Sequence, residues 1–416
     1  AEYIGSMFRQ FGLEPAGDTD ASGTKGFVQR VALETVKITD APTLTAGGGS
    51  NVKKWQYGRD FLVSFLRTPR ISGELQLIEG DATPSKGAIA LIRLPDGVNQ
   101  QERQQIIREA FSAQAAAVVV VETEANKTTR ESGSARLPNL PGRITGAGSA
   151  EGSFAVIALR RDAFDELAGM SNGTRVEFVA PTQPADSGAT WNAIGVLPGT
   201  DANAGGEAIV LSAHLDHLGV GQAVNGDTIY NGADDDATGC VAVLELARVL
   251  ASGKRPRRTV YFVCFGSEER GGLGSRYFVD HSPVPLDKIV ANIQFEMLGR
   301  PDSKVAPNTL WLTGYERSSL GPTLAQQGAR LVADPHPDQN FFQRSDNYTL
   351  ALRGVVAHTV SSFGLHPDYH RPSDDIAKID FSFMTQAINS LVTPIRWLAN
   401  SNFRPAWLAG QQPRRS

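Results

Sequence analysis

An apolar run that ends abruptly in metal-ligand residues is the feature that most constrains this chain. Within Ala208–Gly239, an apolar segment is followed by His214, Asp216 and His217, and then by three consecutive aspartates, 234–236, in a Gly- and Asn-rich loop. The apolar segment predicts a buried strand. Open α/β sheets build their binding sites at the carboxyl ends of such strands. We therefore expect this stretch to form half of a metal centre.

Strand and helix patterns alternate from Trp191 to the C-terminal region. The run Arg258–Phe265 is apolar after its first two residues, as is typical of a strand buried on both faces. This alternation predicts an α/β fold with a mixed, mostly parallel sheet and helices on both faces. The expected strands are Ile194–Leu197, Ile209–Ala213, Arg258–Phe265, Ile289–Phe295, Thr309–Thr313 and Gly354–Val360, and the expected helices are Ala237–Leu250, Leu320–Gln327 and Phe381–Ala399.

A chain of 416 residues is long for one domain, and the segment 42–185 has a character of its own. It contains strand and helix patterns, a loop-rich entry at Thr45–Asn51 and a long polar stretch at 123–150 that we expect to be a loop. From Val52 to Ser187 it has no His and no Cys. We predict one domain formed by residues 1–41 and 186–416, and a smaller inserted α/β domain over residues 42–185.

The composition argues against several classes of partner. The chain is 41% apolar and 20% charged with a formal net charge of −4, so we expect no nucleic-acid partner. The longest aliphatic run, Ala115–Val121, is too short to span a bilayer. The chain begins at Ala1 without an apolar leader, and we expect a mature secreted or periplasmic form. Cys240 and Cys264 are expected to be buried free thiols.

Further acidic and histidine residues follow later strands. Glu268 and Glu269 come after one apolar run, Glu296 ends the next, and His370 lies near the C-terminus. Carboxylates that converge in a low-dielectric crevice raise one another's pKa values unless cations neutralise them. Two divalent ions would leave a small positive charge beside Asp234, Glu269 and Glu296, and would lower the pKa of a water towards about 7. Mixed nitrogen and oxygen ligands suit two Zn²⁺ ions, with Co²⁺ or Mn²⁺ as substitutes.

The same residue types also have ordinary explanations. A pair of glutamates at a strand end is usually solvated, and three aspartates could form a turn or a calcium loop, although the EF-hand spacing is absent. His217 is more often a supporting residue than a ligand in such a position. His366 lies four residues before His370 and competes with it for the ligand role. Adjacent Glu268 and Glu269 point in different directions along extended backbone, which would separate a general base from a ligand.

Six motifs in this order resemble one family. They are VLSAHLDHLG, NGADDDATGCVAVLELARVL, FVCFGSEERGGLGSRYF, NIQFEMLGR, RSDNY and HPDYHRPSD. Together they resemble the di-zinc aminopeptidases of metallopeptidase family twenty-eight, over Trp191 to Leu398. The segments SKGAIALIRL and AQAAAVVVVE of the inserted domain are similar to a protease-associated domain.

The resemblance implies a ligand set. One zinc would be held by His214, Asp234 and Glu296, and the other by Asp234, Glu269 and His370, so that Asp234 bridges the two. Glu296 stands where many relatives have Asp, which lengthens the arm of the carboxylate by one methylene. The family often has a cis peptide after the bridging residue, which here would be Asp234–Asp235.

The resemblance also implies the remaining roles. Glu268 would be the general base, Asp216 would orient His214 through the ring N–H, and Asp235 would be a supporting residue. The Tyr369 hydroxyl would polarise the scissile carbonyl.

The implied activity is hydrolysis of the N-terminal peptide bond of peptides with a free N-terminus, with a metal-activated water as nucleophile. Phe341, Phe342 and Phe363 are expected near the side-chain pocket. The alternatives are a carboxypeptidase or dipeptidase of the same fold, a glutaminyl cyclase, or a non-catalytic binding protein.

Overall fold

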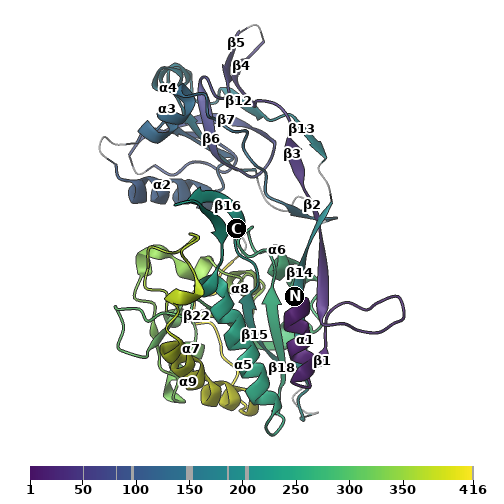
Figure 1. The fold of residues 1–416 in the computed structure, drawn as a ribbon. Coiled ribbons are helices and arrows are strands. Elements are labelled where there is room, and N and C mark those ends of the chain that lie inside the picture. The colour runs from purple at the N-terminus through teal and green to yellow at the C-terminus, as the bar shows by residue number, and fades with distance from the viewer. Residues whose placement is uncertain are drawn as a thin grey trace. The chain divides into compact units, whose positions relative to one another are not determined.

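The structure is a computed structural model that describes residues 1–414 apart from positions 50, 81, 95–97, 147–152, 185–186 and 202–205. It divides into two compact units, one formed by Ala1–Ala32 with the chain from Ala189 onward, and the other by Leu33–Gly188. The expected first border, 41/42, differs from the observed division at 32/33. The second, 185/186, lies outside the described residues. Figure 1 shows the elements of both units.

The first unit contains a mixed, mostly parallel sheet, as predicted. Its strands run in the order β2-β14-β18-β15-β19-β22-β20-β21. β15 pairs in parallel with β18 and β19, and β19 pairs in parallel with β22, whereas β14–β18 and β20–β22 are antiparallel. The bounds are β1 Glu14–Pro15, which pairs with β14, β2 Val28–Glu34, β14 Gly188–Leu197, β15 Ala208–His214, β18 Thr259–Phe265, β19 Ile289–Glu296, β20 Leu310–Leu312, β21 Leu331–Ala333 and β22 Ala357–Ser361.

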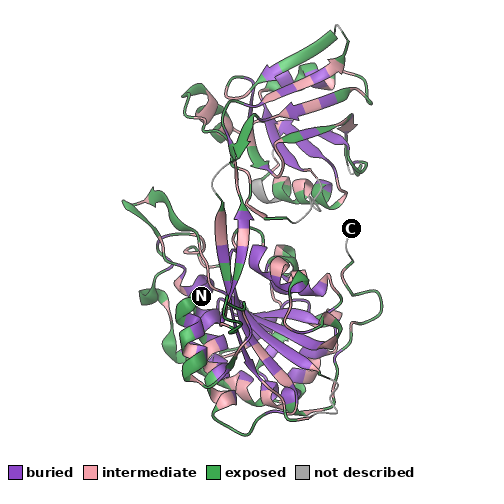
Figure 2. Cartoon of the chain, turned by 90° about the vertical axis from the view of Figure 1, so that its right-hand side faces the viewer, coloured by how far each residue is buried: buried purple, intermediate pink, exposed green. Residues whose placement is uncertain are grey.

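Helices cover both faces of this sheet, which explains why its central strands are apolar throughout. On β15, Ile209 and Leu211 pack into one core and Ala208 and Val210 into the other. Figure 2 shows the strands of this sheet largely in the colour of buried residues. Alternate side chains of a strand point to opposite faces, so both sets must be apolar. One core includes α1 (Glu2–Gln10), α5 (Gly239–Ala251), α7 (Leu320–Gln326) and α9 (Phe381–Asn400), and the other includes α6 (Leu273–Asp280) and α8 (Asn347–Ala351).

A two-stranded hairpin, β16 (Gly219–Val224) with β17 (Asp227–Tyr230), was not predicted. It separates His217 from the irregular turn η2 (Ala233–Thr238). Its apolar residues Val220 and Ile229 are exposed, so the burial that gives a core strand its apolar runs is absent here.

The second unit is an α/β domain around an eight-stranded sheet in the order β5-β4-β12-β7-β8-β9-β11-β6. The bounds are β3 Val36–Ile38, β4 Thr43–Gly48, β5 Asn51–Gln56, β6 Phe61–Leu66, β7 Arg70–Ile78, β8 Ile89–Ile92, α2 Gln100–Ser112, β9 Ala117–Val121, α3 Glu124–Glu131, β10 Arg143–Ile144, β11 Ala155–Leu159, α4 Arg161–Ala168, β12 Arg175–Val179 and β13 Thr182–Pro184.

Two loop predictions in this unit are wrong. The glycine-rich entry forms the antiparallel hairpin β4–β5, in which Gly47 and Gly48 pair with Val52 and Asn51. The polar stretch after Thr123 contains helix α3, although that helix buries no residue. Thr123 accepts a hydrogen bond from the N–H of Asn126 and completes a capping box, so local capping rather than burial starts this helix.

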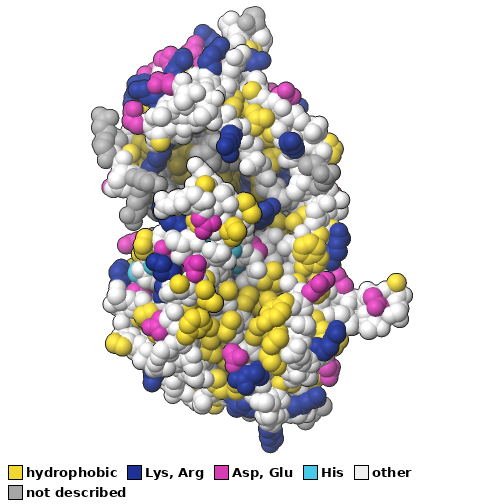
Figure 3. Space-filling view, in the orientation of Figure 1, with side chains coloured by type: hydrophobic (Ala, Val, Ile, Leu, Met, Phe, Trp, Pro, Cys, Tyr) yellow, Lys and Arg dark blue, Asp and Glu magenta, His cyan; other side chains and the backbone are white. Residues whose placement is uncertain are grey.

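The two cysteines are as predicted. Cys240 and Cys264 are buried and free. No helix among the described residues has the length and apolar character to cross a bilayer. On the face drawn in Figure 3, acidic and basic side chains are interspersed.

His358 on β22 is a buried neutral histidine whose tautomer follows from its neighbours. Ser318 Oγ accepts the N–H of Leu320 and donates to His358 Nε2 at 2.7 Å. The Thr313 carbonyl oxygen can only accept, so Nδ1 carries the proton and donates to it at 2.7 Å, and Nε2 of the neutral ring is the acceptor from Ser318. Burial lowers the pKa of His358 to about 4, because the charged ring would lose its hydration.

This site predicts a loss of stability in acid. A histidine whose folded pKa lies below its unfolded value stabilises the fold above the unfolded pKa, and that stability is lost as the pH falls towards the folded pKa. For a folded pKa of about 4, the free energy of unfolding should fall by about 2 kcal/mol between pH 7 and pH 5 through this residue. Urea unfolding of wild type and His358→Gln at both pH values should show the smaller pH dependence in the variant. Equal pH dependence would contradict this origin.

Candidate metal centre

The carboxyl end of β15 presents the first imidazole of the site. His214 is buried, and its Nδ1 lies 3.0 Å from the main-chain oxygen of Asp216. A proton on Nδ1 donates to that oxygen and leaves Nε2 free to face the centre. We expected the Asp216 carboxylate in this role, but its Oδ1 lies 3.9 Å from Nδ1. The carboxylate instead accepts the main-chain N–H groups of Glu268 at 2.9 Å and Glu269 at 3.3 Å.

Asp235, rather than Asp234, lies at the middle of the site. Its Oδ1 is 3.1 Å from His214 Nε2, and its Oδ2 is 3.3 Å from His370 Nε2. The two oxygens of one buried carboxylate therefore face two different imidazoles. This is the geometry that we predicted for Asp234, displaced by one residue along the chain.

Asp234 points away from this group. Its Oδ1 accepts the N–H of Gly299 at 2.7 Å and the hydroxyl of Thr238 at 3.1 Å. Its Oδ2 lies 3.1 Å from His366 Nε2. The non-helical backbone of the turn directs successive side chains apart, so three identical residues acquire different surroundings. The structure does not bring Asp234 or His366 among the other expected ligands.

Asp236 joins two strand ends. Its carboxylate accepts the main-chain N–H groups of His214 at 3.2 Å, Gly239 at 3.1 Å and Met297 at 3.0 Å. His214 ends β15 and Met297 directly follows β19, so this buried side chain fixes their spacing. The cis peptide bond is Asp235–Asp236 and not the expected Asp234–Asp235.

Two groups of possible ligand atoms share Asp235. The first group is His214, Asp235 and Glu296, and the second is His217, Asp235 and Glu269. Within each group the ligand atoms lie within 4.8 Å of one another. Because one carboxylate belongs to both groups, two cations could be held side by side.

His370 also faces the second group. Its Nε2 is 3.1 Å from Glu269 Oε2 and 3.3 Å from Asp235 Oδ2. His217 Nδ1 is 3.0 Å from Glu269 Oε1 and 3.7 Å from Asp235 Oδ2. The sequence predicts only a supporting role for His217, whereas the structure places it in the second group. Its sequence position in HLDH carried a signal, since it follows the same strand as His214.

The donor atoms of these groups fit divalent cations. Several buried nitrogens and oxygens form no hydrogen bond, namely His214 Nε2, both ring nitrogens of His217, His370 Nε2, Glu269 Oε1 and Glu296 Oε2. Buried polar atoms without partners are rare and costly. Imidazole nitrogen and carboxylate oxygen are the ligand types that Zn²⁺ takes in proteins.

The pKa values of the site reflect the crowding of its carboxylates. Burial raises the pKa of Glu296 to about 7 and raises the pKa of Glu268 well above its usual range. Burial lowers the pKa of His370, but the Asp235 and Glu269 carboxylates outweigh it and raise that pKa to about 9. Carboxylates crowded in a low-dielectric site raise one another's pKa values, and nearby positive charge opposes this rise.

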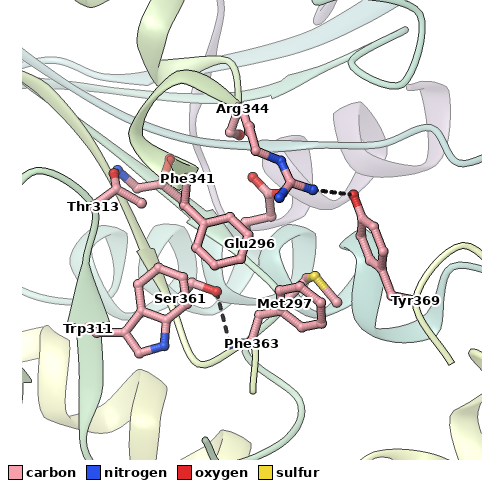
Figure 4. A pocket seen from close by; sticks show the side chains of 11 residues that line it. Glu296, Met297, Trp311, Thr313, Phe341, Arg344, Ser361, Phe363 and Tyr369 are labelled. Carbon is pink, nitrogen blue, oxygen red and sulfur yellow. Dashed lines mark hydrogen bonds between the residues drawn. The ribbon is translucent and has the colours of Figure 1, made fainter. Parts of the chain in front are cut away.

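An aromatic pocket opens beside Glu296 (Figure 4). It is lined by Glu296, Met297, Trp311, Thr313, Phe341, Arg344, Ser345, Thr359, Ser361, Phe363 and Tyr369. Of the three phenylalanines expected there, Phe341 and Phe363 line it, whereas Phe342 packs in the core that includes α6 and α8. Arg344 lies over the Phe341 ring and donates to Tyr369 Oη at 3.3 Å. The Tyr369 ring stacks on His370.

The sequence of this region matches a known protein family. Residues 192–393 match the model of peptidase family M28. This region belongs to peptidase family M28. The matched residues include every histidine and acidic residue of the two groups, with His370 and Tyr369.

Several curated relatives are named as aminopeptidases, and the chain covers them only in part. A probable lipoprotein aminopeptidase, LpqL of Mycobacterium tuberculosis, is 28% identical over 54% of this chain and 48% of its own length. Aminopeptidase YwaD of Bacillus subtilis is 29% identical over 39% of this chain and 36% of its own. The chain thus spans about half, or less, of these relatives.

Solved structures show the same fold. The aminopeptidase from Aneurinibacillus sp. strain AM-1 has a TM-score of 0.54 at 19% identity, covering 100% of this chain and 91% of that chain. BSAP, a zinc aminopeptidase from Bacillus subtilis, has a TM-score of 0.51 at 17% identity with the same coverage. These identities concern the fold alone.

Because Asp236 packs closely against Gly239, replacing this helix glycine by alanine should lower the stability of the protein. Gly239 has helical φ and ψ, where alanine normally stabilises a helix by about 1 kcal/mol. A Cβ there would overlap the Phe295 main-chain oxygen and the Asp236 carboxylate. Gly239→Ala should therefore destabilise the unit by about 2 kcal/mol, measured by urea unfolding.

Gly26→Ala is the matched control in the same unit, because a Cβ there would meet its nearest atom at 3.6 Å. A Gly239→Ala protein as stable as wild type would show that the helix can shift without cost.

Proposed function

We propose that this chain is a metal-dependent aminopeptidase that hydrolyses the N-terminal bond of peptides with a free N-terminus. The observation that carries the proposal is the Asp235 carboxylate shared by two groups of unpartnered ligand atoms, beside a pocket that Glu296 also lines. The M28 match of the region and the aminopeptidase activity named for these relatives support the choice of reaction.

Two Zn²⁺ ions are the proposed cofactors. His214, Asp235 and Glu296 would hold one, and Asp235, Glu269 and His370 would hold the other. We favour His370 over His217 for the second, because His370 Nε2 lies within 3.3 Å of both the Asp235 and the Glu269 carboxylates. His217 would then support Glu269 from its other oxygen. Co²⁺ or Mn²⁺ could replace zinc at ligands of these types.

When bound, the two cations would lower the pKa of a water and polarise the scissile carbonyl. The Glu268 carboxylate would accept a proton from the attacking water and pass it to the leaving amine. Asp216 fixes the main-chain N–H groups of both Glu268 and Glu269, so the proton carrier and the adjacent ligand are oriented together. The Glu296 carboxylate at the pocket attracts the ammonium group of the peptide N-terminus.

Tyr369 would stabilise the negative charge that develops on the carbonyl oxygen. Arg344 donates to the Tyr369 oxygen, so the tyrosine's own proton remains available to donate into the site. Stacking on His370 holds the ring beside the second group. A hydrogen-bond donor placed at such an oxygen typically contributes a large part of the rate.

The remaining proposals concern the second unit and the location of the protein. We propose that Leu33–Gly188 is a protease-associated domain, since the similar segments fall on its central strands β8 and β9. We also propose a secreted or periplasmic location, which agrees with the lipoprotein designation of the mycobacterial relative.

The choice between neighbouring aspartates gives a decisive metal-binding experiment. Asp235→Asn should reduce zinc from about two ions per chain to one or fewer, because it removes a ligand from both groups. Asp234→Asn is the matched control, since its side chain faces Gly299, Thr238 and His366 instead. Elemental analysis after metal supplementation measures both. If Asp234→Asn lost zinc and Asp235→Asn kept it, Asp234 would be the bridging residue.

The proton carrier can be tested separately from metal binding. Glu268→Gln should lower kcat on amino-acyl p-nitroanilides by about 10²–10⁴-fold, because the amide cannot accept the proton of the water. Its zinc content should equal that of wild type. N-acetylated substrates should be inert with wild type, which separates an aminopeptidase from a carboxypeptidase of the same fold. Full turnover by a Glu268→Gln protein that retains its zinc would exclude this mechanism.

A further inference from the structure

We infer that Arg300 is a positioning residue that sets the affinity of the second metal group. It fastens the loop that carries His370 to the turn that carries Asp235. The inference rests on the proposed function, because it assumes that the two groups bind cations. It concerns a residue outside both groups, four positions after Glu296.

The Arg300 guanidinium reaches three carboxylates from different segments. Nη1 donates to Asp368 Oδ2 at 2.8 Å, and Nη2 donates to Asp374 Oδ1 at 3.4 Å. Nε lies 3.9 Å from Asp234 Oδ2. The Arg300 side chain is only 16% exposed, so these contacts are little screened by water.

Two of these carboxylates, Asp368 and Asp374, support a proposed ligand. Asp368 lies two residues before His370 in the same loop. Asp374 accepts the main-chain N–H of Asp234 at 3.0 Å and that of Asp235 at 3.1 Å. It therefore holds the backbone from which the shared carboxylate projects. Arg300 links both anchor points through one rigid, planar group.

The second group depends on this link more than the first. In the first group, His214 and Glu296 end the adjacent paired strands β15 and β19, so the hydrogen-bond ladder fixes them. His370 lies outside any strand or helix and has a positive φ of 56°. Its place therefore depends on side-chain contacts of its loop.

Removing the Arg300 guanidinium would leave buried carboxylates without their main positive partner. Asp234 and Asp374 have fully buried side chains, and both face Arg300. Among the described residues, the other basic groups near this cluster are His366 at Asp234 and Lys378, 4.0 Å from Asp368. Without the guanidinium, the carboxylates would repel one another, and the loop would move away from the turn.

The test measures zinc affinity on the full chain. Stepwise competition with a chromophoric chelator gives the two dissociation constants, and elemental analysis after dialysis gives the stoichiometry. For Arg300→Gln we expect one constant to rise about 10–100-fold and the other to change less than threefold. Arg300→Lys should lie between wild type and Arg300→Gln, because lysine keeps the charge without the fork of donors.

A control and a second variant make the result specific. Arg248→Gln breaks the exposed Arg248–Glu245 pair on α5 and should leave both constants unchanged. Asp368→Asn removes only the contact with the His370 loop, so it should weaken the same single constant even if Arg300→Gln folds poorly.

A double-variant comparison identifies the group concerned. In a His370→Gln background, adding Arg300→Gln should weaken zinc binding by less than threefold, since the ligand positioned by Arg300 is already gone. Equal weakening of both constants, no weakening in either Arg300→Gln or Asp368→Asn, or full additivity with His370→Gln would overturn the inference. A wild type that binds fewer than two zinc ions would instead overturn the proposed function.

Discussion

The site depends on one buried carboxylate with two faces. Asp235 presents one oxygen to His214, which the sheet holds, and the other to His370, which a loop holds. Burying such a group is unfavourable unless opposite charge surrounds it. The backbone that carries Asp235 must therefore be held in place. Asp374 holds it by accepting the main-chain N–H groups of Asp234 and Asp235. Asp374 thereby holds the backbone of the carboxylate that both groups share.

Two kinds of support meet at this carboxylate. Parallel pairing of β15 with β18 and β19 brings the strand ends together, so that His214, the Glu268–Glu269 turn and Glu296 emerge along one edge. Asp236 and Asp216 then tie these ends by accepting main-chain N–H groups from neighbouring strands. The His370 loop has no such ladder and relies on charged side chains. The β-sheet therefore fixes one part of the site, and ion pairs fix the other.

Much of the fold followed from the sequence, because strands buried on both faces of a sheet have continuous apolar runs. β15, β18 and β19 lie within one or two residues of the predicted runs, and α5 and α9 likewise. Predictions failed where local signals outweighed burial or opposed it. Helix α3 forms through its capping box although it buries nothing, and the hairpin β16–β17 carries exposed apolar residues. Neither has the periodicity on which the other predictions relied.

For the site, the sequence by itself determined the residue types and the strand ends at which they gather. It identified the histidines, the glutamates and an aspartate turn, since polar residues after apolar runs fall at one edge of a parallel sheet. Only the tertiary structure decided which of three consecutive aspartates faces the imidazoles, that His217 joins the second group, and that Asp216 orients His214 through its main-chain oxygen. The reason is physical: side-chain direction in an irregular turn depends on partners that are distant in sequence, such as Gly299 and Asp374, and no local pattern records them.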